Sequence, residues 1–277
     1  MKIKREQLSA MNLHYLFYPF EYFLDVQQSL NIKSIEFWGG SPHFLMDDET
    51  YDDCSLIRKM VEDRGMKIKV FTPECTTYPY YTAAWDPYAL KMGRAYYING
   101  IKATKELGAS VMLTNCCGGA RNEDPKAAFD RAVETFKLLA PIAEDNGITL
   151  AVETVRPEES PIVTRIDELK NLIDAVGSPA IKPAMDLVAV AVNYETPKQW
   201  FDTFGQDIAN IHFVDGRPYG HLAWGDGIFP LEDYVKLLNE RAYTGNLGMQ
   251  ITEYDYFAAP DEADRRSMAV LEKYIEG

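Results

Sequence analysis

An α/β fold closed as a single-domain (β/α)₈ TIM barrel, spanning residues 1–277, is predicted by three features of the sequence. Short apolar runs alternate with longer amphipathic stretches eight times along the chain, a pattern typical of parallel strands joined by helices. No linker, low-complexity segment or break in composition divides the chain. The longer connections follow the predicted strands, as they do in barrels whose carboxyl-end loops carry the site.

Each predicted strand is a short run dominated by apolar residues. Several runs follow a glycine that closes the helix before them, and these glycines are Gly65, Gly108, Gly147, Gly177 and Gly245. The runs lie near residues 8–13, 33–38, 67–72, 109–114, 148–153, 181–186, 208–214 and 246–253.

The predicted helices are the longer stretches with amphipathic spacing. Three of them begin with a proline in the first turn, where its missing N–H costs nothing, at Asp86-Pro87, Asp124-Pro125 and Thr196-Pro197. The stretches lie near residues 19–30, 52–64, 87–107, 125–146, 165–176, 196–204, 230–241 and 261–275.

The composition argues against several classes of function. The net charge is −14, whereas nucleic acids and anionic membranes attract clustered Lys and Arg. No apolar run approaches the roughly 18 residues that cross a bilayer, and the N-terminus lacks the apolar segment of a signal peptide. The cysteines form neither a disulfide framework nor a CxxC zinc site, so we expect a reduced, cytoplasmic protein. They are Cys54, Cys75, Cys116 and Cys117.

Four polar side chains come late in the last four predicted strands. Glu153 lies in ITLAVET, Asp186 in IKPAMDL, His212 in IANIHFVD and Glu253 in LGMQITEY. The carboxyl ends of barrel strands share one face, and adjacent strands lie only about 5 Å apart. We therefore expect these side chains to converge on one point.

Three carboxylates and one imidazole around one point predict a divalent metal. Without a cation, the carboxylates would repel one another and raise each other's pKa. The oxygen-rich set suits Mn²⁺ or Mg²⁺, while Co²⁺, Fe²⁺ and Zn²⁺ stay open. The sequence thus indicates an enzyme with one divalent metal and a small-molecule substrate.

Six segments resemble the xylose-isomerase-like barrels, a family that includes sugar isomerases, ketose 3-epimerases and endonuclease IV. The resemblance covers essentially the whole chain and is strongest to the fructoselysine 3-epimerase type. The segments are IEFWGGSPHF at 35–44, TPECTTYPYY at 72–81, VETVRPEESPIV at 152–163, MDLVAVAVN at 185–193, HFVDGRPYGHLAWGDGIFPL at 212–231 and ITEYDYFAAP at 251–260.

The resemblance implies roles for the four polar residues. Glu153, Asp186, His212 and Glu253 would hold the metal, with Mn²⁺ expected and Mg²⁺ or Co²⁺ open. Glu153 and Glu253 would also act as base and acid, one taking the proton from C3 of a ketose and the other returning a proton on the opposite face. The metal would stabilise the enediolate as a Lewis acid. The expected reaction is carbohydrate epimerisation or isomerisation, above all 3-epimerisation of a ketose or ketosamine.

Further residues at the expected barrel mouth are candidates for substrate contacts. A nearby arginine contacts substrate oxygens in the family, which implies Arg217. His221 matches a second-metal position of endonuclease IV, but its companion ligands are missing, so we expect it to contact the substrate instead. Positions in or after the first three strands add His14, Trp38, His43 and Glu74.

One position departs from the family pattern. Endonuclease IV and the free-ketose 3-epimerases carry a histidine three residues after the strand-6 aspartate, where this chain has Ala189. Endonuclease IV also needs more histidines for a three-metal cluster than the four of this acidic chain, so DNA repair is disfavoured. Another group must hold O1 and O2 of a ketose, or the substrate differs there.

Two other functions stay open. The large subunit of bacterial C-glycoside deglycosidases resembles the same barrels; it forms an enolate from a 3-oxo-glycoside, expels an aromatic aglycone by elimination and needs a small β-rich partner subunit. A non-catalytic sugar-binding barrel is the third interpretation, and the complete set of four ligands argues against it. The fold type implies a homo-oligomer.

Overall fold

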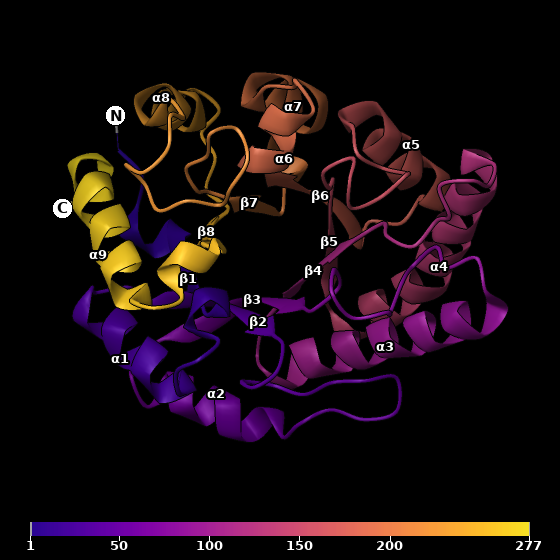
Figure 1. Cartoon of the computed structure of the whole chain (residues 1–277), viewed down its shortest axis with the longest axis horizontal. Coiled ribbons are helices and arrows are strands. Elements are labelled where there is room, and N and C mark those ends of the chain that lie inside the picture. Colours follow the sequence, from indigo (N-terminus) through magenta and orange to yellow (C-terminus); the bar gives the residue numbers. More distant parts are fainter. Residues whose placement is uncertain (1, 277) are drawn as a thin grey trace.

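The computed structural model describes residues 2–276 and shows a closed ring of parallel strands paired in chain order. β8 closes the ring on β1. Figure 1 shows the strands around the centre and the helices outside them, with the two chain ends side by side. The strands are β1 (Leu8–Met11), β2 (Ser34–Gly39), β3 (Lys67–Pro73), β4 (Val111–Asn115), β5 (Thr149–Glu153), β6 (Ile181–Asp186), β7 (Asn210–His212) and β8 (Asn246–Met249).

Helices cover the outside of the strand ring, and the predicted (β/α)₈ barrel is confirmed. The α-helices are α1 (Phe20–Ser29), α2 (Cys54–Glu62), α3 (Pro87–Glu106), α4 (Pro125–Asn146), α5 (Ile166–Val176), α6 (Leu187–Val192), α7 (Pro197–Phe204), α8 (Leu231–Glu240) and α9 (Pro260–Leu271). Short 3₁₀ turns are η1 (Arg5–Gln7), η2 (Leu13–Tyr15), η3 (Gly205–Asp207), η4 (Tyr254–Tyr256) and η5 (Glu272–Tyr274).

Two differences from the sequence prediction lie close to the carboxyl end of the barrel. β8 ends at Met249, because Gln250 and Ile251 donate their N–H groups to carbonyls two residues back and the chain turns out of the ladder. Helix α6 was not predicted. It begins directly after β6, because the Asp186 carboxylate accepts the N–H groups of Val188 and Ala189 and so caps the first turn.

Local signals explain the long helices α3 and α4. Asp86 and Asp124 cap them by accepting the N–H groups of Ala89 and Lys126, with proline in the first turn. Gly147 ends α4 with φ of +69°, a left-handed conformation that glycine adopts without strain. Among residues 2–276, no helix is long and apolar enough to cross a membrane. The four cysteines are buried free thiols.

The inside of the barrel has an apolar side and a polar side. The apolar side is a small buried cluster of Val70, Leu113, Ala151 and Ala184 from β3 to β6. On the polar side, Asn246 donates to Ser9 Oγ at 2.7 Å and to Asn210 Oδ1 at 2.9 Å, and Asn210 donates to Glu36 Oε2 at 3.1 Å. This chain of hydrogen bonds across β1, β8, β7 and β2 fixes a buried carboxylate beneath the barrel mouth.

Candidate metal centre at the carboxyl end of the barrel

Three of the predicted ligands end neighbouring strands and meet inside the barrel mouth. Glu153, Asp186 and His212 are the last residues of β5, β6 and β7, and Asp186 pairs in register with His212. All three are buried, and one potential ligand atom from each lies within 4.8 Å of the others. The ladder register therefore produces the convergence that the strand-end pattern predicts.

His212 lies at the centre of the cluster. Its Nδ1 is 3.1 Å from Glu153 Oε2 and 3.3 Å from Asp186 Oδ2. Its Nε2 is 3.0 Å from Glu36 Oε1. Because a carboxylate only accepts, Glu36 holds the proton on Nε2 and leaves Nδ1 facing the other two carboxylates. An imidazole held by a carboxylate on its far nitrogen is the usual arrangement around a metal-binding histidine.

Glu36 is fixed by donors on both oxygens. Thr72 donates to Oε1 at 2.7 Å and Asn210 donates to Oε2 at 3.1 Å. Gly248 of β8 packs against Glu36, because a Cβ atom at this position would stand 2.2 Å from Glu36 Oε2. Glu36 lies inside β2, and its contact with Nε2 orients the histidine.

The two carboxylate oxygens of Asp186 have different partners: one caps helix α6 and the other faces the cluster. Oδ1 accepts the N–H groups of Val188 at 2.7 Å and Ala189 at 2.8 Å. Oδ2 faces His212 and also lies 2.7 Å from Nε2 of His221. The helix cap thus locks the carboxylate with one oxygen turned into the cluster.

The electrostatics of the cluster favour positive charge. Burial raises the pKa of Glu153, although His212 lowers it in part. Burial would lower the pKa of His212, but the carboxylates of Glu36 and Glu153 raise it well above its ordinary value. Burial would raise the pKa of Asp186, but His221 and His212 hold it well below its ordinary range. Positive charge is therefore stabilised here, and buried oxygens with an imidazole nitrogen suit a divalent metal.

Glu253, the fourth predicted ligand, lies outside the 4.8 Å group. It follows β8 by four residues and is half-buried. Its carboxylate packs against Gly220, where a Cβ atom would stand 3.3 Å from Glu253 Oε1. The N–H of Thr252 donates to the carbonyl of His221, which ties this segment to the β7–α8 loop. Its role as ligand stays a prediction.

The β7–α8 loop, residues 215–229, is held by one buried carboxylate that sequence reasoning missed. Asp215 accepts four backbone N–H groups at 2.9–3.0 Å, and their donors are Gly216, Gly225, Gly227 and Phe229. The loop carries Arg217 and His221. His221 reaches Asp186, whereas the side chain of Arg217 is exposed to solvent.

Trp38 and Glu74 form a pair at the carboxyl ends of β2 and β3. The indole Nε1 of Trp38 donates to Glu74 Oε2 at 2.9 Å. Glu74 Oε1 accepts the N–H groups of Thr76 and Thr77 at 2.7 Å each. The structure gives Glu74 a role in ordering the β3–α3 loop, and contact of either residue with a substrate stays a prediction.

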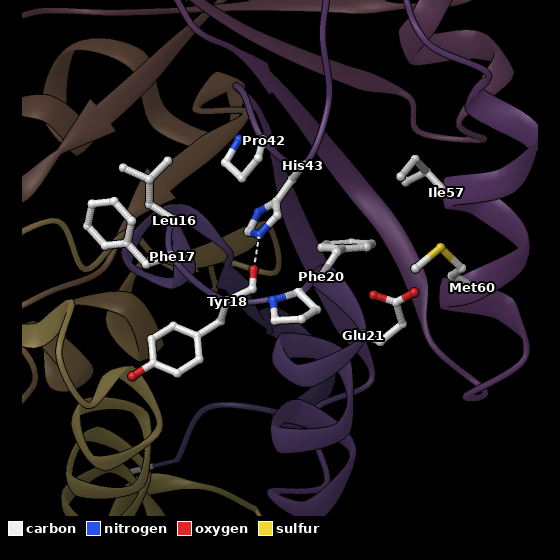
Figure 2. A pocket seen from close by; sticks show the side chains of 10 residues that line it. Leu16, Phe17, Tyr18, Phe20, Glu21, Pro42, His43, Ile57 and Met60 are labelled. Atoms are coloured by element: carbon white, nitrogen blue, oxygen red, sulfur yellow. Dashed lines mark hydrogen bonds between the residues drawn. The ribbon is translucent and has the colours of Figure 1, made fainter.

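His43 lies on the outer side of the mouth, in a hollow of about 600 Å³ between the β1–α1 loop and α2. Figure 2 shows its ring beside the backbone of Tyr18. Its Nε2 is 2.8 Å from the Tyr18 carbonyl and its Nδ1 is 2.9 Å from the Asn12 amide. Burial lowers the pKa of His43, and hydrogen bonds at both ring nitrogens hold the ring in place. A substrate contact of His43 stays a prediction.

His14 follows β1 and is fully buried. Its Nε2 is 3.1 Å from Asp264 Oδ1, while Tyr15 and Gln27 donate to Asp264 Oδ2. Within residues 2–276, Nδ1 of His14 has no hydrogen-bond partner. This network joins the β1–α1 segment to α9, and a substrate contact of His14 stays a prediction.

Arg156 and Glu159 follow Glu153 closely and were missed. Arg156 Nη2 donates to Glu159 Oε1 at 2.6 Å, and this bond raises the pKa of Arg156, with a smaller contribution from Asp186. Glu159 in turn is among the charges that act on Glu153. The signal in the sequence was RPEE at 156–159, charged residues that begin three positions after the last residue of β5, in a loop that leaves the site.

Comparison with known proteins gives the relatives of the chain. A fructoselysine 3-epimerase of Shigella flexneri is 27% identical over 229 residues, covering 82% of this chain and 83% of that protein. One from Escherichia coli O157:H7 is 26% identical with the same coverage. The crystal structure of a D-psicose 3-epimerase matches with a TM-score of 0.79 at 16% identity, covering 99% of this chain and 98% of the other, which supports the fold.

A family model agrees with these relatives. The model described as xylose isomerase-like TIM barrel matches residues 24–274. That range contains the strand-end cluster, Glu36 and the loop carrying His221. The chain therefore belongs to the xylose isomerase-like TIM barrel family.

Proposed function

We propose that this chain is a divalent-metal-dependent carbohydrate epimerase that removes a proton next to a carbonyl, and that its reaction is 3-epimerisation of a ketose or ketosamine. The observation that carries the proposal is the buried cluster of Glu153, Asp186 and His212, whose ligand atoms face one another within 4.8 Å. The names of its relatives, fructoselysine 3-epimerases, support the substrate class.

The residues fit a metal. His212 Nδ1, Glu153 Oε2 and Asp186 Oδ2 would hold it, and Glu253 would complete the set. Mn²⁺ is the proposed ion, with Mg²⁺ or Co²⁺ as alternatives, because the donors are mainly carboxylate oxygens. When bound, a divalent cation supplies Lewis-acid stabilisation of negative charge on the substrate oxygens.

The two glutamates would move the proton. One carboxylate takes the proton from C3, and the electron pair of the C–H bond shifts towards the C2 carbonyl to give an enediolate. The other glutamate donates a proton to C3 on the opposite face, which inverts that centre. Glu153 comes from β5 and Glu253 follows β8, with β6 and β7 between them in the ring. Burial raises the pKa of Glu153, which makes its carboxylate a stronger base than an exposed glutamate.

His221 would take the place of the histidine that related barrels carry at the position of Ala189. Its Nε2 lies 2.7 Å from Asp186 Oδ2, so the imidazole stands beside the cluster although it comes from a different element. An imidazole there can donate to a ketose oxygen, and Arg217 on the same loop is the proposed second contact. The loop is held in one shape by Asp215, which makes these positions reproducible from one turnover to the next.

Proton exchange in D₂O tests the proposal. The purified protein with Mn²⁺ is incubated with ketoses, fructosamines and 3-oxo-glycosides, and NMR follows each carbon. We expect deuterium at C3 of a ketose or fructosamine and loss of exchange with EDTA. Glu153→Gln and Glu253→Gln should each reduce the exchange rate by roughly 10²–10⁴, the usual contribution of a general acid or base.

The exposed residue Glu6, at the other end of the barrel, gives the matched control Glu6→Gln. Exchange that survives in both site variants would contradict the proposed roles. Aglycone release from a 3-oxo-glycoside without exchange in any ketose would assign the elimination reaction, and a small co-purifying subunit would then be sought. Sugar binding with no exchange at all would make the barrel non-catalytic.

The proposal also includes a cytoplasmic homo-oligomer, as expected from the sequence and fold type. Light scattering of the purified protein measures the assembly, and a monomeric mass at working concentration would contradict it. Fractionation of cells that produce the protein tests the location.

A further inference from the structure

A hollow of about 640 Å³ lies on the β3–α3 and β4–α4 loops, outside the strand-end cluster. It is lined by Trp85 from the first loop and by residues 119–123 from the second. Trp85 is 62% exposed, which is unusual for a tryptophan. A flat ring that is exposed beside a hollow can stack on the apolar part of a ligand.

The hollow borders the loops that leave the candidate metal site. Arg121 donates from Nη2 to the carbonyl of Pro157 at 2.7 Å. Pro157 follows Glu153 by four residues, so it lies at most about 14 Å from that ligand along the chain. Gly119 follows Asn115 by four residues, and Asn115 pairs in register with Glu153. The β4–α4 loop lines the hollow and contacts the loop that leaves Glu153, so the hollow and the cluster lie on neighbouring loops.

The walls of the hollow are fixed by hydrogen bonds. The N–H of Ala83 donates to the carbonyl of Cys117 at 3.0 Å, which joins the two loops. Arg131 donates to the carbonyl of Ala83 at 3.2 Å and to Glu123 Oε1 at 2.6 Å. Glu123 Oε1 also accepts the N–H of Ala120 at 2.7 Å. A hollow with pre-formed walls loses little entropy when a ligand binds.

The charge of the hollow favours an anion. The salt bridge with Arg131 neutralises Glu123. Arg121 is exposed and, among residues 2–276, its side chain bonds only to the Pro157 carbonyl. Most of its N–H donors therefore remain for a ligand, and a guanidinium binds a carboxylate with two parallel hydrogen bonds. The chain has a net charge of −14, so an arginine with unused donors beside an exposed indole is a distinctive place for an anion to bind.

We propose that this hollow is a subsite for the carboxylate-bearing, apolar tail of the sugar substrate. The carboxylate pairs with Arg121, the methylene chain of the tail lies on Trp85, and the sugar end reaches the cluster at Glu153. This subsite rests on the proposed function, because it assigns the distal part of the substrate whose ketose end is epimerised. It makes the preferred substrate a ketosamine with an acidic substituent rather than a free ketose.

The test compares three probes in the Mn²⁺-loaded protein. They are the ketosamine of fructose with 6-aminohexanoate, the ketosamine with hexylamine, which lacks the carboxylate, and D-fructose. We expect kcat/KM for C3 exchange to be about tenfold or more higher for the acidic ketosamine than for the neutral one, as for a hydrogen bond to a charged group. Arg121→Gln should bring this ratio close to one. Trp85→Ala should lower the preference for both tailed probes over D-fructose.

Lys137→Gln is the matched control, since it removes one positive charge from an exposed position of α4, and it should keep the wild-type ratios. Arg121→Lys should restore part of the ratio, and melting temperatures verify folding. Equal kcat/KM for the two tailed probes in the wild type, or a ratio that Arg121→Gln leaves intact, would overturn the subsite.

Calorimetric binding of the same probes separates this inference from the proposed function. If no probe exchanges but the acidic one binds more tightly in an Arg121-dependent way, the subsite stands and the epimerase proposal falls. If exchange occurs and binding ignores both the carboxylate and Arg121, the epimerase proposal stands and the subsite falls. If neither tailed probe binds or exchanges, the subsite is wrong.

Discussion

Replacement of Glu36 by glutamine tests whether the buried carboxylate prepares His212 for metal binding. All three partners of Glu36 are donors: the imidazole Nε2 at 3.0 Å, the Thr72 hydroxyl at 2.7 Å and the Asn210 amide at 3.1 Å. A carboxamide turns its NH₂ group towards at least one of them, so one buried donor loses its acceptor. The remaining hydrogen bond to the imidazole is also weaker, because the acceptor is no longer charged.

The expected loss of metal affinity follows from the position of Glu36, which contacts the proposed metal ligand His212 on its far nitrogen. Outer partners of metal-binding histidines contribute about 10–100-fold to metal affinity, which is roughly 1.4–2.7 kcal/mol. Isothermal titration of metal-free protein with Mn²⁺ measures it directly and needs no turnover. We expect the Kd of Glu36→Gln to rise within that range.

The control for this experiment is Glu6→Gln, the exposed glutamate at the opposite end of the barrel. Its Kd for Mn²⁺ should equal that of the wild type, and circular dichroism should show that both variants are folded. A folded Glu36→Gln protein whose Kd for Mn²⁺ stays within a factor of two, about the error of such titrations, would refute the reasoning.

Three further predictions concern stability. Gly248→Ala places a methyl group 2.2 Å from Glu36 Oε2 and should destabilise the protein by roughly 1–3 kcal/mol in urea unfolding; an unchanged midpoint would contradict it. Asp215→Asn replaces one of the two carboxylate oxygens, each of which accepts two backbone N–H groups, with an NH₂ donor, so amides of residues 215–229 should exchange faster with deuterium while the strands keep their protection. Burial lowers the pKa of Lys69 to about 8. The unfolded chain then binds more protons above that pH, so the free energy of unfolding of the wild type should rise from pH 8 towards pH 10 relative to Lys69→Met. Parallel pH profiles would exclude this.

The fold and the convergence of three proposed ligands could be predicted because their signals are local. An apolar run ending in Glu153, Asp186 or His212 places the side chain at the carboxyl end of a strand. Parallel pairing of the strands then brings these ends together. Helix starts such as Asp124-Pro125 were equally readable, since cap and proline act within one turn.

The parts that the sequence did not predict depend on loop conformation. The role of Asp215 arises because residues up to 14 positions later fold back onto its carboxylate. Trp85 and Arg121 belong to different loops and line one hollow only after both are folded. The predicted strand 246–253 was too long, because the turn after Met249 contains no glycine or proline to mark it. Such positions are set by contacts between distant residues, for which the sequence has no periodic signal.

The division between ladder and loop also has a functional consequence. Glu153, Asp186 and His212 are held by strand register, so they move only if the barrel itself distorts. Glu253 and His221 lie on connections, although each is tied to the other segment through the hydrogen bond from Thr252 to the His221 carbonyl. Under the proposed function, substitutions in these connections would change which sugar binds, while the three proposed ligands at the strand ends keep their places. His221 reaches Asp186 from such a connection, so the position of this imidazole depends on the loop and not on the strand register that holds the cluster.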